Sequence, residues 1–284
     1  MRLQGQDALP GGWASRTART RAFQPLRAWA RFIDKTFTIA ELEVRKLRHD
    51  PTELLTRAVQ PALWLLVFGQ VFTRTRAIPT GDLAYIDFMT PGILAQSVLF
   101  IAIFHGIGVI WERDLGIIHK FLVSPTPRMA LVLGKALSAG VRGLSQAVII
   151  YTLALLLGVR LNWHPLALLG VLAVILLGAA FFSTFSLIIA CLVKTRERFM
   201  GIGQVLTMPL FFASNAIYPI AIMPGWLQAI SRVNPLTYEV DALRALMLAG
   251  GTTVHGLGLD FGVLLAATAA LVVIGGQLYP KVVI

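Results

Sequence analysis

The sequence has few of the residues from which catalytic and metal-binding centres are built. Its single cysteine, Cys191, lies in an apolar run, so an internal disulfide is impossible and a packed thiol is expected. A phosphate-binding loop is missing, because Met129 stands where the pair Gly134-Lys135 would need an earlier glycine. The five histidines are widely separated along the chain. The sequence therefore predicts no catalytic residue, no metal site and no nucleotide-binding site in this chain.

Charged residues are also scarce. They make up 14% of the chain, whereas 56% is hydrophobic. Soluble domains carry roughly 25% charged residues. The apolar residues form long runs, which is typical of segments that cross a lipid bilayer. Inside hydrocarbon the backbone polar groups must be paired within the protein, so each run is expected to be a helix. The sequence thus predicts an all-α integral membrane protein.

Six apolar segments are expected to cross the bilayer, after a basic N-terminal region. The spans are residues 54–72, 88–111, 137–158, 166–193, 199–218 and 257–279, within a transmembrane domain of residues 50–284. Residues 1–28 are predicted to be a flexible basic tail. Residues 29–49 place Ile33, Phe37 and Val44 on one side of a helix and basic residues on the other. We expect this segment to be an amphipathic helix that lies in the headgroup plane.

Prolines interrupt the apolar pattern before the last span. Pro209, Pro219 and Pro224 cannot all lie in one straight spanning helix. Backbone that breaks at membrane depth must be buried in protein or line water. We therefore expect residues 215–230 to form short helices that dip back toward the outer leaflet.

The distribution of basic residues predicts the orientation in the membrane. Twenty of the 25 lysine and arginine residues lie in the N-terminal region, in two connectors or near the C-terminus. The other five, assigned to the opposite loops, are Arg74, Arg76, Arg160, Arg232 and Arg244. The side with twenty is expected to be cytoplasmic, so both termini lie inside. The formal net charge of +11 then reflects orientation, and no binding to nucleic acid is predicted.

The connector after the second span has the pattern of a docking element. Leu115, Ile118 and Leu122 would share one face of a helix. Charged residues from Glu112 to Lys120 would then be available to water or to a partner protein. A helix that rests on the membrane would show the same pattern, and this interpretation stays open here.

Several motifs together resemble one family of transport proteins. The connector reads Phe-Leu-Val-Ser-Pro at 121–125, with Gly116 before it, and Pro-Gly-Ile-Leu-Ala stands at 91–95. A second motif near the C-terminus consists of Asn234, Pro235, Leu236, Tyr238 and Arg244. These residues resemble ABC-2 type permeases, the membrane subunits of one class of ABC transporter, over about residues 30–280. The likeness is strongest to the branch of daunorubicin-type drug, Nod-factor and polysaccharide exporters.

The resemblance implies partners and a mechanism. Two separate ATP-binding subunits would bind ATP and magnesium, and a second permease copy, identical or related, would complete the complex. The chain itself would bind no cofactor and would not be an enzyme. The expected place is the cytoplasmic membrane of a prokaryote, and the expected cargo is a hydrophobic or amphipathic drug, lipid, polyketide or glycan.

Two sets of site residues follow from the resemblance. The residues expected to couple to the ATPase are Arg45, Lys46, Arg48, Glu112, Arg113, Asp114 and Lys120. Related transporters pass substrate along their second and fifth spans. The residues expected to line this pathway are Gln96, Phe100 and Phe104 on one helix face and Met208, Phe212 and Asn215 on another. Ordinary helix packing would explain the same spacing, and this alternative stays open.

Two other classes of function are alternatives at this stage. An ion-coupled transporter or channel would need buried charges or internal repeats. A membrane-embedded lipid-modifying enzyme would need catalytic residues clustered near one interface. Neither feature is identified in the sequence.

Overall fold

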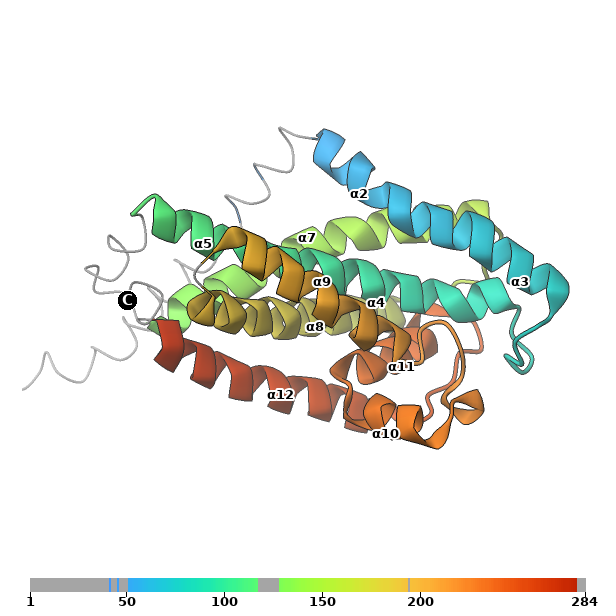
Figure 1. Cartoon of the computed structure of the whole chain (residues 1–284). Coiled ribbons are helices and arrows are strands. Elements are labelled where there is room, and N and C mark those ends of the chain that lie inside the picture. The colour runs from blue at the N-terminus through green and yellow to red at the C-terminus, as the bar shows by residue number, and fades with distance from the viewer. Residues whose placement is uncertain (1–40, 42–44, 46–50, 117–127, 194, 280–284) are drawn as a thin grey trace, which may run out of the picture.

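The computed structural model describes residues 41, 45, 51–116, 128–193 and 195–279 (Figure 1). These residues are almost entirely helical, and their one β feature is an isolated bridge between Leu161 and Leu248. The elements are α2 (Pro51–Leu63), the π-helical η1 (Trp64–Gly69), α3 (Gln70–Thr75), α4 (Tyr85–His105), α5 (Ile107–Asp114), α7 (Arg128–Leu156), α8 (Pro165–Leu192), α9 (Arg196–Phe212), the 3-10 helix η2 (Ile220–Ile222), α10 (Gly225–Val233), α11 (Pro235–Met247) and α12 (Leu257–Leu278).

Four helical segments of the described chain are long and apolar enough to cross a membrane. They are Tyr85–Asp114, Leu131–Leu156, Pro165–Leu192 and Leu257–Leu278. These segments correspond to the second, third, fourth and sixth predicted spans. The prediction of a membrane protein built from helices is therefore confirmed.

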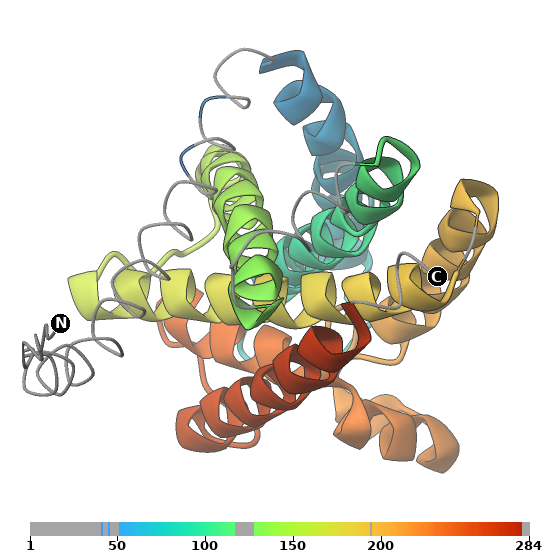
Figure 2. The same ribbon diagram turned by 90° about the vertical axis from the view of Figure 1, so that its left-hand side faces the viewer.

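Helix α8 is the centre of the bundle. It packs against α7 and α4 on one side and against α11 and α12 on the other (Figure 2). Its sequence is apolar almost throughout, and its buried face includes Phe181, Phe182 and Leu187. A helix that is apolar all round is suited to contact neighbours on several sides.

The first predicted span is one continuous helix of mixed type. Helices α2, η1 and α3 follow one another without a break from Pro51 to Thr75. The π-helical turn begins three residues after Pro61, which has no N–H to donate to the preceding turn. Leu65 and Gly69 face the bundle, whereas Val67 is half-exposed on the opposite side.

The fifth predicted span ends earlier than expected. Helix α9 stops at Phe212, although the sequence predicted a helix to residue 218. The Ser214 hydroxyl donates to the carbonyl of Phe211 and accepts from the N–H of Ala216, so it stabilises a turn in place of further helix. The two short helices η2 and α10 follow, as the prolines predicted.

The N-terminal half of α4 packs closely on the turn that follows α9. A Cβ atom added at Gly92 would lie 2.7 Å from the Cα of Ala216, so only glycine fits this contact. The Pro91-Gly92 pair, which the sequence analysis took as typical of the family, thus has a packing role.

The helix ends gather at two ends of the bundle. The C-termini of α5, α8 and α12 and the N-termini of α7 and α9 lie together (Figure 1). We call this the basic end, because Arg113, Lys135, Arg196 and Arg198 belong to it. The loop between α3 and α4, the loop between α7 and α8, helix α10 and the N-terminus of α12 lie at the opposite end.

Candidate functional site

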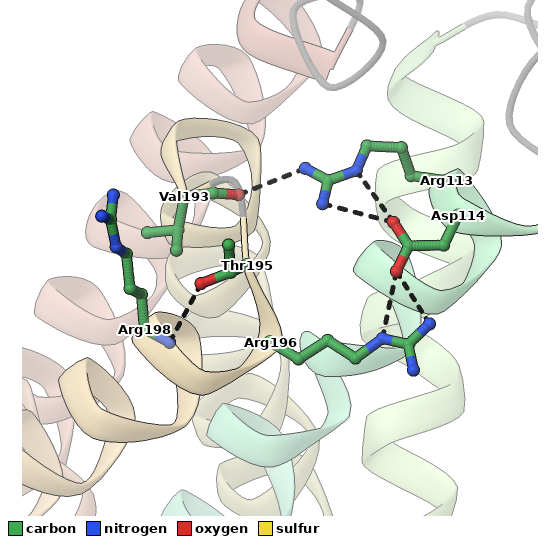
Figure 3. Close-up of polar contacts among 6 residues, drawn as sticks. All are labelled: Arg113, Asp114, Val193, Thr195, Arg196 and Arg198. Atoms are coloured by element: carbon green, nitrogen blue, oxygen red, sulfur yellow. Dashed lines mark hydrogen bonds and ion pairs between the residues drawn. The ribbon is translucent and has the colours of Figure 1, made fainter.

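At the basic end, one carboxylate joins two helices. Asp114 is the last residue of α5, and its Oδ2 atom accepts hydrogen bonds of 2.7 and 3.0 Å from Arg196, the first residue of α9 (Figure 3). Arg113 lies 3.4 Å from the other oxygen of Asp114 and donates to the carbonyl of Val193 at 3.2 Å. The end of α5 is thereby connected to the segment between α8 and α9.

Two further contacts extend this cluster. The guanidinium of Arg196 lies 3.8 Å from the ring centre of Trp111, at a distance typical of a cation–π interaction. Lys135 of α7 contacts both carboxylate oxygens of Glu112 at 2.7 Å. Helix α5 is therefore hydrogen-bonded to α7 as well as to α9. We call Trp111, Glu112, Arg113, Asp114, Lys135 and Arg196 the α5 cluster.

The α5 cluster changes the expectation for the predicted coupling residues. Glu112, Arg113 and Asp114 were expected to be available to water or to a partner, but each contacts another part of this chain. Arg45 is exposed and pairs with Glu41 at 2.7 Å. The remaining predicted coupling residues, Lys46, Arg48 and Lys120, lie outside the described residues, as does most of the predicted interfacial helix 29–49.

The expected helical connector is not continuous. Helix α5 ends at Asp114, and Gly116 has a φ angle of +69°, which right-handed helix does not permit. Leu115 therefore cannot share one uninterrupted helix face with Ile118 and Leu122, and that prediction was wrong. Residues 117–127 lie outside the described part of the chain.

A cavity of about 270 Å³ lies between α2, α4 and α7. The three predicted pathway residues of α4 line it together. Gln96 is buried, and the rings of Phe100 and Phe104 stack with their centres 6.1 Å apart. The other lining residues are Thr56, Gln60, Ser97, Ile101 and Gln146. The cavity thus combines two aromatic rings with several amide and hydroxyl groups.

Gln146 is a lining residue that the sequence analysis missed. Its side chain is fully buried, and within the described part of the chain neither of its amide atoms has a hydrogen-bond partner. Buried amides nearly always have partners, so an unpaired one beside a cavity marks a place where a ligand or water can bind. The available signal was the position of this polar residue inside the predicted span 137–158.

The predicted pathway residues near the fifth span do not lie together. Met208 and Phe212 are partly exposed on α9. Asn215 lies beyond the end of this helix and is buried, with its backbone carbonyl accepting a 2.7 Å hydrogen bond from Arg244. The expectation that Asn215 shares a helix face with Met208 and Phe212 was wrong, because the turn at Ser214 ends the helix first.

The second family motif has a local structural role. Asn234 caps α11 by accepting from the N–H of Leu236 at 3.0 Å, and Pro235 occupies the first helical turn. The side-chain amide of Asn234 also donates to the carbonyl of Leu210 at 2.7 Å. Tyr238 donates to the carbonyl of Arg232 at 2.5 Å. The motif therefore connects the start of α11 to α9 and α10.

Arg244 completes this arrangement from the other end of α11. It donates to the carbonyls of Phe88 and Asn215, and its guanidinium lies 3.8 Å from the ring centre of Phe88. Only 5% of Arg244 is exposed. The sequence analysis had counted Arg244 among the residues of an outer loop, and the structure corrects this assignment, because the arginine lies inside the helix bundle.

Glu239 is a second residue that sequence reasoning missed. It lies on α11, is fully buried beside Gly178 of α8, and has no hydrogen-bond partner within the described chain. A Cβ atom at Gly178 would collide with its carboxylate. The missing side chain at Gly178 therefore makes room for Glu239.

These features define a class: a helical, multi-pass membrane protein with a cavity between its helices and an ion-paired cluster at one end. Comparison with known proteins then gives the family. The model of the ABC-2 type transporter family matches residues 34–248, and the chain belongs to this family. The resemblance seen in the sequence motifs is confirmed, and the matched region contains the cavity and the α5 cluster.

Individual relatives agree with this assignment. The ycf38 protein of Cyanophora paradoxa, named as a transport permease, is 30% identical over 76% of this chain and 74% of its own length. The daunorubicin resistance ABC transporter permease protein DrrB1 of Streptomyces coeruleorubidus is 27% identical over 95% of this chain and 92% of its own. Nodulation protein J of Rhizobium meliloti is 28% identical over 64% and 68%. The chain is thus a membrane permease of the ABC transporter type.

Proposed function

We propose that this chain is the six-span permease subunit of an exporter, driven by ATP that a separate subunit hydrolyses. Two ATP-binding subunits, which hold ATP and magnesium, and a second permease copy would complete the transporter. The cargo is a hydrophobic or amphipathic compound. The chain lies in the cytoplasmic membrane of a prokaryote, with both termini on the cytoplasmic side.

The α5 cluster is the observation that carries this proposal. A permease without a nucleotide site must receive motion through its surface. Asp114 connects the end of α5 to the start of α9, Arg113 connects it to Val193 at the end of α8, and Glu112 connects it to Lys135 of α7. A force applied to α5 at the basic end therefore reaches α7, α9 and the segment between α8 and α9 through hydrogen-bonded contacts. We propose that the α5 cluster transmits conformational changes of the ATPase to the membrane spans.

Helix lengths support the count of six spans. The continuous helix from Pro51 to Thr75 is about 37 Å long, enough for a hydrocarbon core of about 30 Å. Helix α9 has 17 residues, about 25 Å, and a buried turn of residues 213–217 follows it. With these two, the helices alternate in direction between the basic end and the opposite end (Figure 1). Helices η2 and α10 form the element that dips back from the outer side.

The orientation follows from the same arrangement. Twenty of the 25 lysine and arginine residues were assigned to the side that includes Arg113, Lys135, Arg196 and Arg198, and basic loops face the cytoplasm. The basic end is accordingly the side that meets the ATPase. The cavity beside Phe100 and Phe104 lies between the spans, where a compound could enter from this side or from the membrane.

The lining of the cavity supports an amphipathic cargo. Ligand pockets of this kind combine apolar and aromatic walls with a few polar groups that orient the ligand. Phe100 and Phe104 supply the aromatic walls, and Gln96 and Gln146 supply the polar groups. One relative is named for resistance to daunorubicin, a planar amphipathic amine, which makes this compound a suitable first probe.

Reconstitution tests the proposal. The full chain, purified in mild detergent from cells that encode it, should co-purify with a subunit whose sequence contains a phosphate-binding loop. In inside-out proteoliposomes that contain both proteins, ATP should drive accumulation of daunorubicin or of another compound that stimulates the ATPase. Vesicles with either protein alone are the control and should accumulate nothing. ATP hydrolysis by the chain alone, or transport without a second subunit, would overturn the proposal.

A further inference from the structure

Three side chains that are far apart in the sequence converge at the opposite end of the bundle. Asp241 belongs to α11, His255 to the loop that follows it, and Asp260 to the first turn of α12. Each offers one ligand atom, and these atoms lie within 4.8 Å of one another. We call these residues the Asp–His–Asp group. It is separate from the cavity, the α5 cluster and the proposed contact with the ATPase.

Asp241 holds the loop in place. Its carboxylate accepts from the N–H of Val254 at 2.8 Å and from the N–H of His255 at 3.0 Å. One ring nitrogen of His255 lies 3.3 Å from the same carboxylate, and the ring of Tyr238 packs against the imidazole with centres 5.1 Å apart. The imidazole is therefore held between the Asp241 carboxylate and the Tyr238 ring.

Asp260 is the unusual member of the group. It is fully buried, and within the described chain neither of its carboxylate oxygens has a hydrogen-bond partner. Burial of an unpaired carboxylate costs free energy, and repulsion from the nearby carboxylate of Asp241 increases this cost. The hydrogen bonds of Arg244 in the described structure go to the carbonyls of Phe88 and Asn215, and none is formed with Asp260. Asp260 thus points an unpaired ligand atom into the group.

We propose that Asp241, His255 and Asp260 bind one divalent transition-metal ion, with zinc as the best match. One imidazole nitrogen and two carboxylate oxygens are ligands that zinc accepts in a tetrahedral site with a water in the fourth position. Calcium and magnesium prefer six or more oxygen ligands, which this group does not supply. The side chain of His255 is 21% exposed, so an ion and its water can reach the group from the surface.

The geometry needs only a small adjustment to hold the ion. Ligand atoms around tetrahedral zinc lie about 3.4 Å apart, given zinc–ligand distances of about 2.1 Å. The ligand atoms here lie within 4.8 Å, so rotation of the Asp260 and His255 side chains closes the difference. The ion would join α11, which carries the family motif, to the first turn of α12.

Direct metal binding tests the proposal on the full chain alone, without an ATPase, so its failure is distinct from that of the proposed function. Purified protein in detergent, with any affinity tag removed, is equilibrated with zinc chloride. Bound metal is measured by plasma mass spectrometry. We expect about one zinc ion per chain and a higher midpoint of thermal unfolding with zinc than with a chelator. Cobalt(II) in place of zinc should give the visible absorption bands of tetrahedral coordination.

Variants identify the ligands. Asp260→Asn and His255→Gln should each weaken zinc binding about tenfold or more and remove the shift in unfolding. Asp82→Asn and His164→Ala are the matched controls, since both residues are exposed and lie outside the group, and they should bind zinc as the parent chain does. If Asp260→Asn does not fold, His255→Gln decides the result. Absence of stoichiometric zinc, or binding unchanged in His255→Gln, would overturn the proposal.

Discussion

Arg196 and Asp114 join the first residue of α9 to the last residue of α5 through two hydrogen bonds, of 3.0 and 2.7 Å. The two residues are 82 positions apart in the sequence, and the Trp111 ring covers the guanidinium on its face. The contact connects the ends of two helices.

Breaking the pair should impair coupling more than folding. Both side chains are about one-third exposed, so the pair contributes about 1 kcal/mol, which corresponds to about a fivefold effect. Asp114→Asn is expected to lower ATP-driven transport about fivefold in proteoliposomes, while ATP hydrolysis continues. The double exchange of Asp114→Arg with Arg196→Asp should recover part of the loss, and Asp82→Asn at the opposite end is the control. Equal loss of transport in the control would refute the role of the pair.

Substitutions in the cavity should change substrate preference without loss of assembly. Gln146→Leu removes two unpaired polar atoms from a buried position, so the variant chain is expected to be as stable as the parent. We expect a changed KM for amphipathic cargo, and Phe100→Ala should act in the same direction by removing one of the stacked rings. The measurement is ATP-driven uptake against cargo concentration. Val148→Ala, on an exposed position of the same helix, provides the comparison, and an identical KM in all four proteins would exclude the cavity from the pathway.

Close packing at Gly92 predicts a stability effect. Gly92→Ala places a methyl group against the backbone of Ala216, which cannot move aside as a side chain could. The expected cost is about 1–3 kcal/mol, seen as a lower midpoint of thermal unfolding in detergent. Gly108→Ala is the matched control, because a Cβ atom there has nothing within 4 Å. It should leave stability unchanged or raise it, and the prediction is wrong if the two variants unfold alike.

Arg244 is expected to be required for folding, because its side chain is buried and does not contribute to the charge of the surface. Arg244→Gln removes the contacts to two backbone carbonyls and to the ring of Phe88, and leaves buried acceptors unpaired. We expect little monodisperse protein in size-exclusion chromatography. Arg232→Gln changes an exposed arginine of the neighbouring helix α10 and should behave as the parent chain. Normal yield of Arg244→Gln would show that these contacts are dispensable.

The apolar runs predicted the four spans that the described structure supports, because length and hydropathy are local properties of the sequence. The ends of helices were harder to predict. The positive φ angle of Gly116 ends α5, and the hydroxyl of Ser214 ends α9, and both effects depend on single residues inside helical patterns. Periodicity placed Gln96, Phe100 and Phe104 on one face of α4, and all three line the cavity.

Contacts between distant segments could not be predicted from one sequence. Gln146 joins the cavity only because α7 packs beside α4, and Glu239 is buried only because Gly178 leaves space on α8. The Asp–His–Asp group has intervals of 14 and 5 residues, which match no familiar metal-binding spacing. These contacts form only when the helices pack together, so the order of residues in one sequence does not reveal them.

The π-helical turn at Trp64–Gly69 allows the first helix to tolerate a change in length. A π turn holds one residue more than the α turn that it replaces. Deletion of Val67 would therefore convert the turn to ordinary α-helix and leave Thr56 and Gln60 directed at the cavity. The same deletion within an unbroken helix such as α8 would rotate everything before it by about 100°. Insertions and deletions accepted during evolution should accordingly concentrate in this turn.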